Sequence, residues 1–309
     1  MRFPLGHTAG VRRVGGATLG ENVQMDQPAV DRLIALLDLE VIEVNIFRGR
    51  SPDDIRQRVF GGQVAGQALV AATRTVDADF AVHSLHSYFL RPGDPTAPIL
   101  YEVDRTRDGH TFVTRRVLAI QHGAAIFGLS ASFHLPETGF DHQMPMPEGL
   151  PEPESLPDFA TRMEPWKDVL GEWYTRPRPI DTRYCDWHAP DDRRSHSMFQ
   201  NVWFRADGTL PDDPVLHAVV ATYASDMTVL DTSLQPHGGS GLGDIFMASL
   251  DHAMWFHRPF RADEWLLYAQ DSPSASGGRG LGRGLMFTRD GKLAVSVVQE
   301  GLIRPARTH

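Results

Sequence analysis

The sequence predicts an α+β protein built from one unit used twice, in which a helix precedes an antiparallel meander of strands. Two segments share one plan, a polar and aromatic strand closed by Arg-Pro, at residues 82–92 and 249–259. Each is followed by two or three strand-like runs and a hairpin turn, at 121–123 in the first copy and 289–291 in the second. Self-similarity on this scale indicates an internal repeat.

The first half has the periodicity of two helices and a series of strands. Helical spacing gives an apolar face at 31–39, and strand-like alternation follows at 41–48. A glycine pair, Gly61 and Gly62, then opens a helix rich in small residues that ends near Ala72 and can lie very close to a sheet. With turn residues between them, further strands are expected at 82–89, 98–106, 111–121 and 124–134.

The segment from 136 to 195 is rich in proline, which favours extended chain, and it has one short helical pattern near 166–173. We interpret this segment as a crossover between two units rather than a third domain. The first unit then covers 27–135 and the second 196–309, and we expect residues 1–26 to form a disordered N-terminal extension. The second unit predicts a strand, a helix, a glycine-rich loop and four strands, at 197–205, 213–225, 234–243, 248–256, 264–271, 277–288 and 293–303.

Composition restricts the class of protein. With 309 residues, 41% of them hydrophobic, the chain can bury one large core or two medium ones. A net charge of -9 argues against a general nucleic-acid binder, so an anionic ligand would need a local basic patch. The single cysteine, Cys185, excludes an internal disulfide framework and favours a reducing compartment, so we expect a cytoplasmic protein. No apolar run approaches the roughly 20 residues of a membrane span.

Asp226 continues the apolar stripe of the second predicted helix. Val219, Tyr223 and Asp226 follow one another at three- and four-residue steps, so the carboxylate lies on the face that turns towards the sheet. A buried carboxylate is costly unless it is hydrogen-bonded or used in chemistry. Alternatively, Asp226 caps the helix end by accepting bonds from loop amides. The corresponding helix of the first half has no acid, which favours the second half as the chemical one.

The last strand also has a polar residue on an apolar face. Gln299 lies on the side that carries Val295 and Val297, by the two-residue period of a strand. A buried amide needs partners for its donors and its acceptor, and the alternative is an edge glutamine that faces water. By the same period, Ser249 shares a side with Asp251 in the opening strand.

Asp226, Ser249 and Gln299 together offer a carboxylate, a hydroxyl and an amide, which suffice to hold one water molecule and remove its proton. No serine or cysteine nucleophile with a positioned base is evident. The glycine-serine run at 238–242 departs from the nucleophile elbow, because Leu242 stands where that motif has its last glycine. A serine hydrolase is therefore disfavoured.

The strand at 277–285 alternates glycine with larger residues. Its glycines make a flat face for close backbone approach, while Arg279 and Arg283 project two guanidinium groups suited to ligand phosphates. The alternative is a solvated strand edge that resists aggregation. Four histidines lack the spacing of a metal-binding pair on a helix, so we predict no metal and a structural role for His83, His86, His252 and His257.

Five motifs between residues 27 and 304 strongly resemble those of the type II acyl-CoA thioesterases. In chain order they are VFGGQ at 59–63, HSLHSYFLRPGD at 83–94, YASD at 223–226, LDHAMWFHRP at 250–259 and VQEG at 298–301. The resemblance implies two hotdog units fused in one chain, each a long helix wrapped by an antiparallel sheet. It also implies hydrolysis of fatty acyl-CoA to a fatty acid and free CoA, with no cofactor.

The resemblance also assigns roles to residues. The family's catalytic aspartate, hydroxyl residue and glutamine match Asp226, Ser249 and Gln299, although the family pattern has threonine at the hydroxyl position. Serine keeps the hydroxyl but lacks the methyl group that restricts its rotamers, so we expect the same role with less rigid positioning. Candidate substrate-binding residues are Gly61, Gly62, Arg279 and Arg283. We also expect a homo-oligomer.

Two other functions are compatible with the sequence. The first is a hotdog enoyl-CoA hydratase or dehydratase that uses Asp251 and His252 as an acid–base pair, but adjacent residues of a strand point to opposite faces. The second is a non-catalytic module that binds acyl-CoA, in which the polar residues are structural. Release of free thiol from acyl-CoA distinguishes the hydrolase from both.

Overall fold

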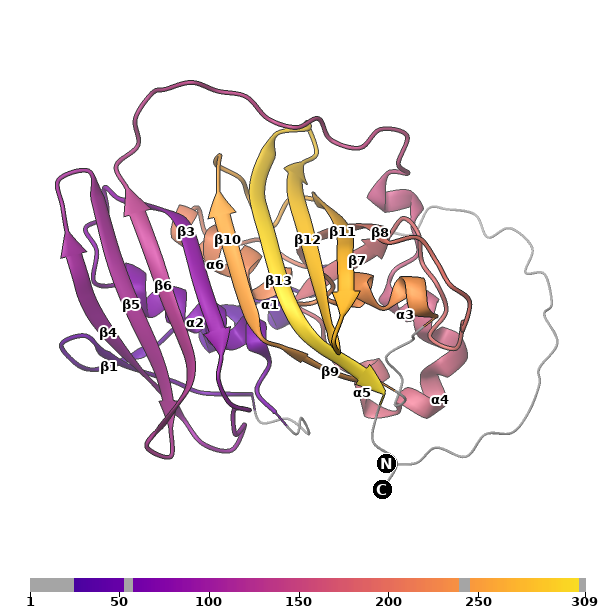
Figure 1. Ribbon diagram of the computed structural model, residues 1–309, viewed down its shortest axis with the longest axis horizontal. Coiled ribbons are helices and arrows are strands. Elements are labelled where there is room, and N and C mark those ends of the chain that lie inside the picture. Colours follow the sequence, from indigo (N-terminus) through magenta and orange to yellow (C-terminus); the bar gives the residue numbers. More distant parts are fainter. Residues whose placement is uncertain (1–24, 53–57, 239–244, 306–309) are drawn as a thin grey trace.

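The computed structural model describes residues 25–52, 58–238 and 245–305, so the expected N-terminal extension lies almost wholly outside the described residues. Within them, every strand belongs to one antiparallel sheet, and helices α2 and α6 lie behind it in the view of Figure 1. The prediction of an α+β fold with an antiparallel sheet is confirmed. Among the described residues, no helix combines the length and the apolar character needed to cross a membrane.

The first half begins with α1 (Gln27–Leu37), which Asp26 caps by accepting a hydrogen bond from the Ala29 N–H at 3.1 Å. Helix α2 packs against strands β4, β5 and β6 through its small residues. The remaining elements of this half are β1 (Glu40–Glu43), β2 (Ile46–Gly49), α2 (Gly61–Thr73), β3 (Ala81–Phe89), β4 (Ile99–Asp108), β5 (Phe112–Gln121) and β6 (Ala124–His134).

The second half contains helix α6 (Pro214–Ser225), which begins at a favourable first-turn proline and is capped by Asp213. The short 3-10 helices η3 (Asp231–Ser233) and η4 (Gln235–His237) follow it. The strands of this half are β7 (Ile180–Tyr184), β8 (Phe199–Ala206), β9 (Ile245–Ser249), β10 (Asp251–Phe256), β11 (Leu266–Ser276), β12 (Arg279–Thr288) and β13 (Leu293–Pro305).

The two halves share one sheet. Its strand order is β1-β2-β4-β5-β6-β3-β10-β13-β12-β11-β8-β7, and β9 also pairs with β13. The halves meet where β3 pairs with β10, in a register that places Tyr88 opposite Asp251 and Ser84 opposite Trp255. The two segments that share the Arg-Pro plan are therefore neighbours at the centre of the sheet.

Three predicted elements differ from the structure. The strand expected at 41–48 is a hairpin of β1 and β2, because Asn45 adopts a left-handed conformation with φ of 61°. The strand expected at 248–256 is divided at Leu250 into β9 and β10. The crossover has more regular structure than predicted: β7, and the short helices η1 (Pro153–Ser155), α3 (Phe159–Met163), η2 (Glu164–Trp166), α4 (Lys167–Leu170) and α5 (Glu172–Thr175).

Two glycines of α2, Gly62 and Gly66, face a helix rather than the sheet. A Cβ at Gly62 would lie 2.3 Å from the backbone oxygen of Tyr223, and a Cβ at Gly66 would lie 3.6 Å from that of Val219. Both contacted residues belong to α6, so small residues let the two helices pack closely. This packing brings the start of α2 to the end of α6.

Candidate active site

Three polar side chains converge at the C-terminal end of α6. Gln299 Nε2 donates to Asp226 Oδ1 and to Ser249 Oγ, both at 2.8 Å, and Ser249 Oγ donates to Asp226 Oδ1 at 3.1 Å. Gln299 is fully buried, whereas Asp226 and Ser249 each keep part of their surface accessible. The residues singled out by the sequence as a possible water-holding set therefore lie in mutual contact.

Asp226 is held in place by the segment that follows it. A Cβ at Gly282 of β12 would lie 2.4 Å from the backbone oxygen of Val229, so the flat glycine face predicted for this strand is confirmed. Gln270 of β11 donates to Thr228 Oγ1 at 2.5 Å and secures the same segment through a buried hydrogen bond. The chain after α6 thus lies directly on the sheet, which fixes the point from which the carboxylate projects.

Ser249 reaches Asp226 because the strand is irregular at Leu250. Ser249 pairs with Gly301 of β13, and Ala253 pairs with Val298. The chain therefore advances four residues from Ser249 to Ala253 while β13 advances only three. Such a bulge reverses which side chains face inward. Leu250 is pinned there, since its N–H donates to Glu300 O and its carbonyl accepts from Phe89 N–H, both at 2.9 Å.

The bulge corrects the predicted grouping of Ser249 with Asp251. Ser249 shares the inner side with His252, and both contact Gln299. The Asp251 carboxylate instead accepts a hydrogen bond from the Glu300 N–H at 2.7 Å. Asp251 and His252 therefore do not form a pair.

His252 is buried behind the three polar side chains. Its Nδ1 lies 2.6 Å from Gln299 Oε1, and its Nε2 lies 2.8 Å from Ser225 Oγ. Sequence reasoning predicted a structural role for His252 without linking it to Gln299, because the link depends on the bulge. A histidine two residues before the buried Met254, opposite a glutamine, is the sequence signal that could have indicated it.

The start of α2 completes the surroundings of Asp226. A Cβ at Gly61 would lie 2.6 Å from Asp226 Oδ2 and 2.8 Å from the Phe89 ring, and the Gly62 N–H donates to the carboxylate. Gly61 and Gly62, predicted as substrate-binding residues, thus lie beside the carboxylate. The site combines a helix start from the first half with side chains from the second.

Burial dominates the protonation of this site. It raises the pKa of Asp226 above the ordinary value of 3.8, against the opposing effects of His252 and of hydrogen bonds from Gln299, Ser249 and the Gly62 N–H. Burial lowers the pKa of His252 below the ordinary value of 6.5, although the nearby carboxylate opposes this shift. A neutral imidazole therefore lies behind a carboxylate that accepts a proton more readily than an exposed aspartate.

The structure does not bring Arg279 and Arg283 to this site. They alternate with the glycines that face α6 and its following segment, so they project from the opposite face of β12. Arg279 donates to Glu300 at 2.9 Å, and Arg283 makes two bonds to Asp271. The alternative interpretation of this strand as a sheet edge is wrong, because β12 pairs on both sides.

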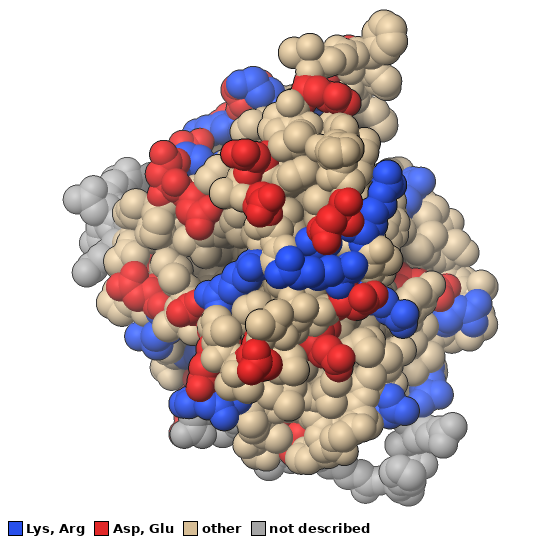
Figure 2. Space-filling view, turned by 90° about the vertical axis from the view of Figure 1, so that its left-hand side faces the viewer, with Lys and Arg blue, Asp and Glu red and all other residues tan. Residues whose placement is uncertain are grey.

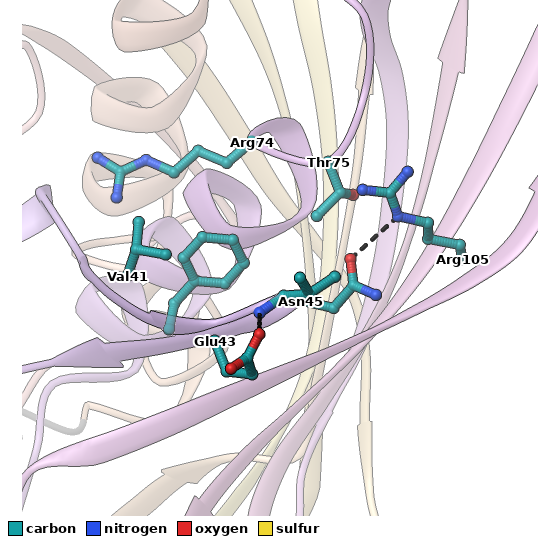
Figure 3. A pocket seen from close by; sticks show the side chains of 8 residues that line it. Val41, Glu43, Asn45, Arg74, Thr75 and Arg105 are labelled. Atoms are coloured by element: carbon teal, nitrogen blue, oxygen red, sulfur yellow. Dashed lines mark hydrogen bonds between the residues drawn. The ribbon is translucent and has the colours of Figure 1, made fainter.

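A hollow of about 410 Å³ lies elsewhere, at the C-terminal end of α2 (Figure 3). Arg74 and Thr75 line it together with Asn45, which accepts a hydrogen bond from Arg105 at 3.0 Å. A helix of 13 residues is about 18 Å long, so this hollow is separated from Gly61 by the length of α2. It is not part of the polar site.

Basic groups form a band bordered by acidic groups on the face shown in Figure 2, rather than a broad positive surface. The absence of a nucleic-acid partner stays a prediction. His188, Asp192 and His196 bring one possible metal ligand each within 4.8 Å of one another. However, the two imidazole rings are stacked 3.5 Å apart and Arg194 pairs with Asp192, so the lone pairs do not converge on one point.

Comparisons with known proteins agree on one class. A family model described as acyl-CoA thioesterase matches residues 188–302, and one described as acyl-CoA thioesterase N-terminal domain matches residues 50–134. The chain is 43% identical to acyl-coenzyme A thioesterase 8 of Rattus norvegicus, over 87% of this chain and 88% of that protein.

Solved structures give the same result. The acyl-CoA thioesterase II TesB2 of Mycobacterium marinum matches with a TM-score of 0.74 and 46% identity, over 90% of this chain and all (100%) of that one. A protein from Alicyclobacillus acidocaldarius described as having a hot dog fold matches with a TM-score of 0.71 and 17% identity, over 90% and 99% of the two chains. The second likeness concerns the fold alone.

Proposed function

The chain belongs to the acyl-CoA thioesterase family and is a thioester hydrolase, and from this premise we propose how it works. It hydrolyses fatty acyl-CoA to a fatty acid and CoA by direct attack of a water molecule held by Asp226, Ser249 and Gln299. The observation that carries the proposal is the set of three mutual hydrogen bonds among these side chains.

Asp226 acts as the general base. Ser249 and Gln299 both donate to Oδ1, and the Gly62 N–H also donates to the carboxylate, which fixes its position; in this mechanism Oδ2 takes the proton of the water. The water oxygen attacks the thioester carbon while its proton passes to the carboxylate. Collapse of the tetrahedral intermediate breaks the carbon–sulfur bond, and the proton then passes to the departing CoA thiolate. A raised pKa suits this cycle, because the carboxylate must accept a proton and return it.

The thioester oxygen lies at the start of α2 in this mechanism. The first N–H groups of a helix have no partner within the helix and lie at the positive end of its dipole. Gly61 brings the start of α2 beside Asp226 without a side chain in between, while the Gly62 N–H bonds to the carboxylate itself. Removal of one such donor to an oxyanion typically costs about 3 kcal/mol of barrier.

The fold consists of two fused hotdog units, 27–135 and 196–309, joined by the crossover at 136–195. This part of the proposal is supported by the two family models, which match separate halves, and by one long helix from each half, α2 and α6, packed together behind the shared sheet. The acyl chain lies between the halves, where Phe89 flanks Gly61. A homo-oligomer and a cytoplasmic location stay predictions.

The test is release of free thiol from short, medium and long acyl-CoAs, by wild type and by Asp226→Asn. The isosteric amide cannot accept the proton, so we expect thiol release to fall on the order of 1,000-fold with folding retained. Asp213→Asn is the matched control at the other end of α6, because asparagine caps helices as well as aspartate does. Full activity of Asp226→Asn would remove this residue from the mechanism.

Hydration of crotonyl-CoA without thiol release would instead favour the hydratase. The separate hydrogen bonds of Asp251 and His252 argue against this outcome, because the two side chains serve different neighbours.

A further inference from the structure

The orientation of one carboxamide decides whether the three polar side chains can work together. Gln299 is fully buried, and its NH2 group donates to both Asp226 and Ser249. A carboxamide turned by 180° would place its oxygen against the carboxylate, and both donated bonds would be lost. Asp226 opposes this turn only while it is ionised, because a protonated carboxyl can donate, and the Ser249 hydroxyl can donate as well as accept.

The other end of the carboxamide meets His252. The distance of 2.6 Å from Nδ1 to Gln299 Oε1 is that of a hydrogen bond, and an oxygen can only accept. Nδ1 must therefore carry the hydrogen. In the neutral ring Nε2 is then an acceptor, and Ser225 Oγ lies 2.8 Å from it and 2.9 Å from Thr222 O, so the one hydroxyl hydrogen has two acceptors within reach. His252 is 1% exposed, so solvent does not supply these bonds instead.

Burial favours this neutral form of His252 against the effect of the charged groups around it. Asp226 and Asp251 pull its pKa upward, but burial outweighs them. The Tyr268 hydroxyl of β11 donates to Ser225 O at 3.2 Å rather than to the His252 ring. The hydrogen bonds then run in one direction, from His252 through Gln299 to Asp226.

We propose that His252 is a positioning residue: its Nδ1–H holds the Gln299 carboxamide with its NH2 group towards Asp226 and Ser249. The inference rests on the proposed function for its consequence in catalysis. The orientation itself is a property of the free protein.

The first experiment reads the tautomer directly. Long-range ¹H–¹⁵N correlation spectra of the full chain distinguish protonated from unprotonated ring nitrogens, and the signals of His252 are those lost in His252→Asn. We expect protonated Nδ1 and unprotonated Nε2 at neutral pH. A hydrogen on Nε2 instead would overturn the proposal, whatever the enzyme's activity.

The second experiment tests the coupling to Gln299. His252→Leu removes the donor, and we expect kcat to fall on the order of 100-fold with KM little changed, as for a misplacement of about 1 Å. His252→Asn keeps an N–H near the position of Nδ1 and should recover kcat to within about tenfold of wild type. In a Gln299→Leu background, His252→Leu should add less than about twofold, because no carboxamide remains to be oriented.

The outcomes separate the two proposals. The positioning role would be overturned if the losses in kcat from His252→Leu and Gln299→Leu multiplied in the double variant. It would also be overturned if His252→Asn folded but had a kcat as low as that of His252→Leu. A wild type that releases no thiol would overturn the proposed mechanism but leave the tautomer result standing.

Discussion

In the described part of the chain, the contacts of the Asp226 carboxylate are hydrogen-bond donors rather than positively charged side chains. Two side chains and one backbone N–H bond to its carboxylate, and the one titratable base beside it, His252, is itself held neutral by burial. Hydrogen bonds without a full positive charge stabilise the carboxylate less than an ion pair would. The residue therefore stays ionisable and basic, which is the requirement of its proposed role.

Gly61→Ala should inactivate the site without unfolding the chain. Its Cβ would lie 2.6 Å from Asp226 Oδ2, in the space assigned to the water and the thioester oxygen. We expect kcat/KM for thiol release to fall on the order of 100-fold, as for a displacement of about 1 Å, with a lower melting temperature because the Cβ would also lie 2.8 Å from the Phe89 ring. Gly66→Ala, in the same helix, meets the flexible end of Leu37 at 3.0 Å and the Val219 backbone oxygen at an ordinary 3.6 Å, and it should keep its activity. Equal activity of both variants would contradict the assignment.

As the pH is lowered, kcat/KM should begin to fall at a higher pH than an ordinary aspartate would cause. Asp226 works only when ionised, and burial raises its pKa above 3.8, so activity falls as the pH falls through that raised value. The measurement is thiol release between pH 4 and pH 9 at constant ionic strength. This fall at low pH should persist in Asp213→Asn and be absent from the residual activity of Asp226→Asn.

At the scale of single elements, simple periodicity predicted most strands and helices and brought Asp226 and Gln299 to the correct faces. It failed at Ser249, whose inward direction depends on a bulge at Leu250. No alternation of polar and apolar residues signals that bulge, because the pinning bonds come from Phe89 and Glu300, which are remote in sequence. Periodicity reports which face a residue shares only while a strand stays regular.

Gly282→Ala should lower activity indirectly, by displacing the segment that follows Asp226. The added Cβ would lie 2.4 Å from the Val229 backbone oxygen, so the segment after Asp226 would have to move. We expect a loss of about 1–3 kcal/mol in the free energy of unfolding, together with a lower kcat. Gly128→Ala is the control in β6, since its nearest atom, in Leu118, lies at an ordinary 3.5 Å. Urea unfolding and thiol release measure both effects, and an unperturbed Gly282→Ala would show that the close approach is dispensable.

On the scale of the whole molecule, the sequence predicted the repeat but not where its copies meet. The polar side chains were expected from the second repeat alone, whereas α2 of the first lies against the same carboxylate. That contact depends on how α2 and α6 pack, which neither helix encodes by itself. Likewise the pairing of β3 with β10 joins segments far apart along the chain.

The two halves should stay together after the crossover is cut. A protease site inserted between Thr138 and Gly139 would be accessible, because nothing lies near Gly139, while Gln143 beyond the cut keeps its bonds to Gly291 and Leu293. We expect the cleaved fragments to elute as one species in size-exclusion chromatography and to retain thiol release, with the uncut insertion variant as control. Separation of the fragments, or loss of activity on cleavage, would show that the strand pairing and helix packing between the halves are insufficient.

The junction between β3 and β10 also limits how such chains can be recombined. A chimaera that took residues 27–135 from one parent and 196–305 from another would have to match the register across the central strands and the glycine contacts of α2 with α6 at once. Neither half can therefore be exchanged alone. Exchange of segments between relatives should preserve activity only when β3, β10, α2 and α6 all come from the same parent.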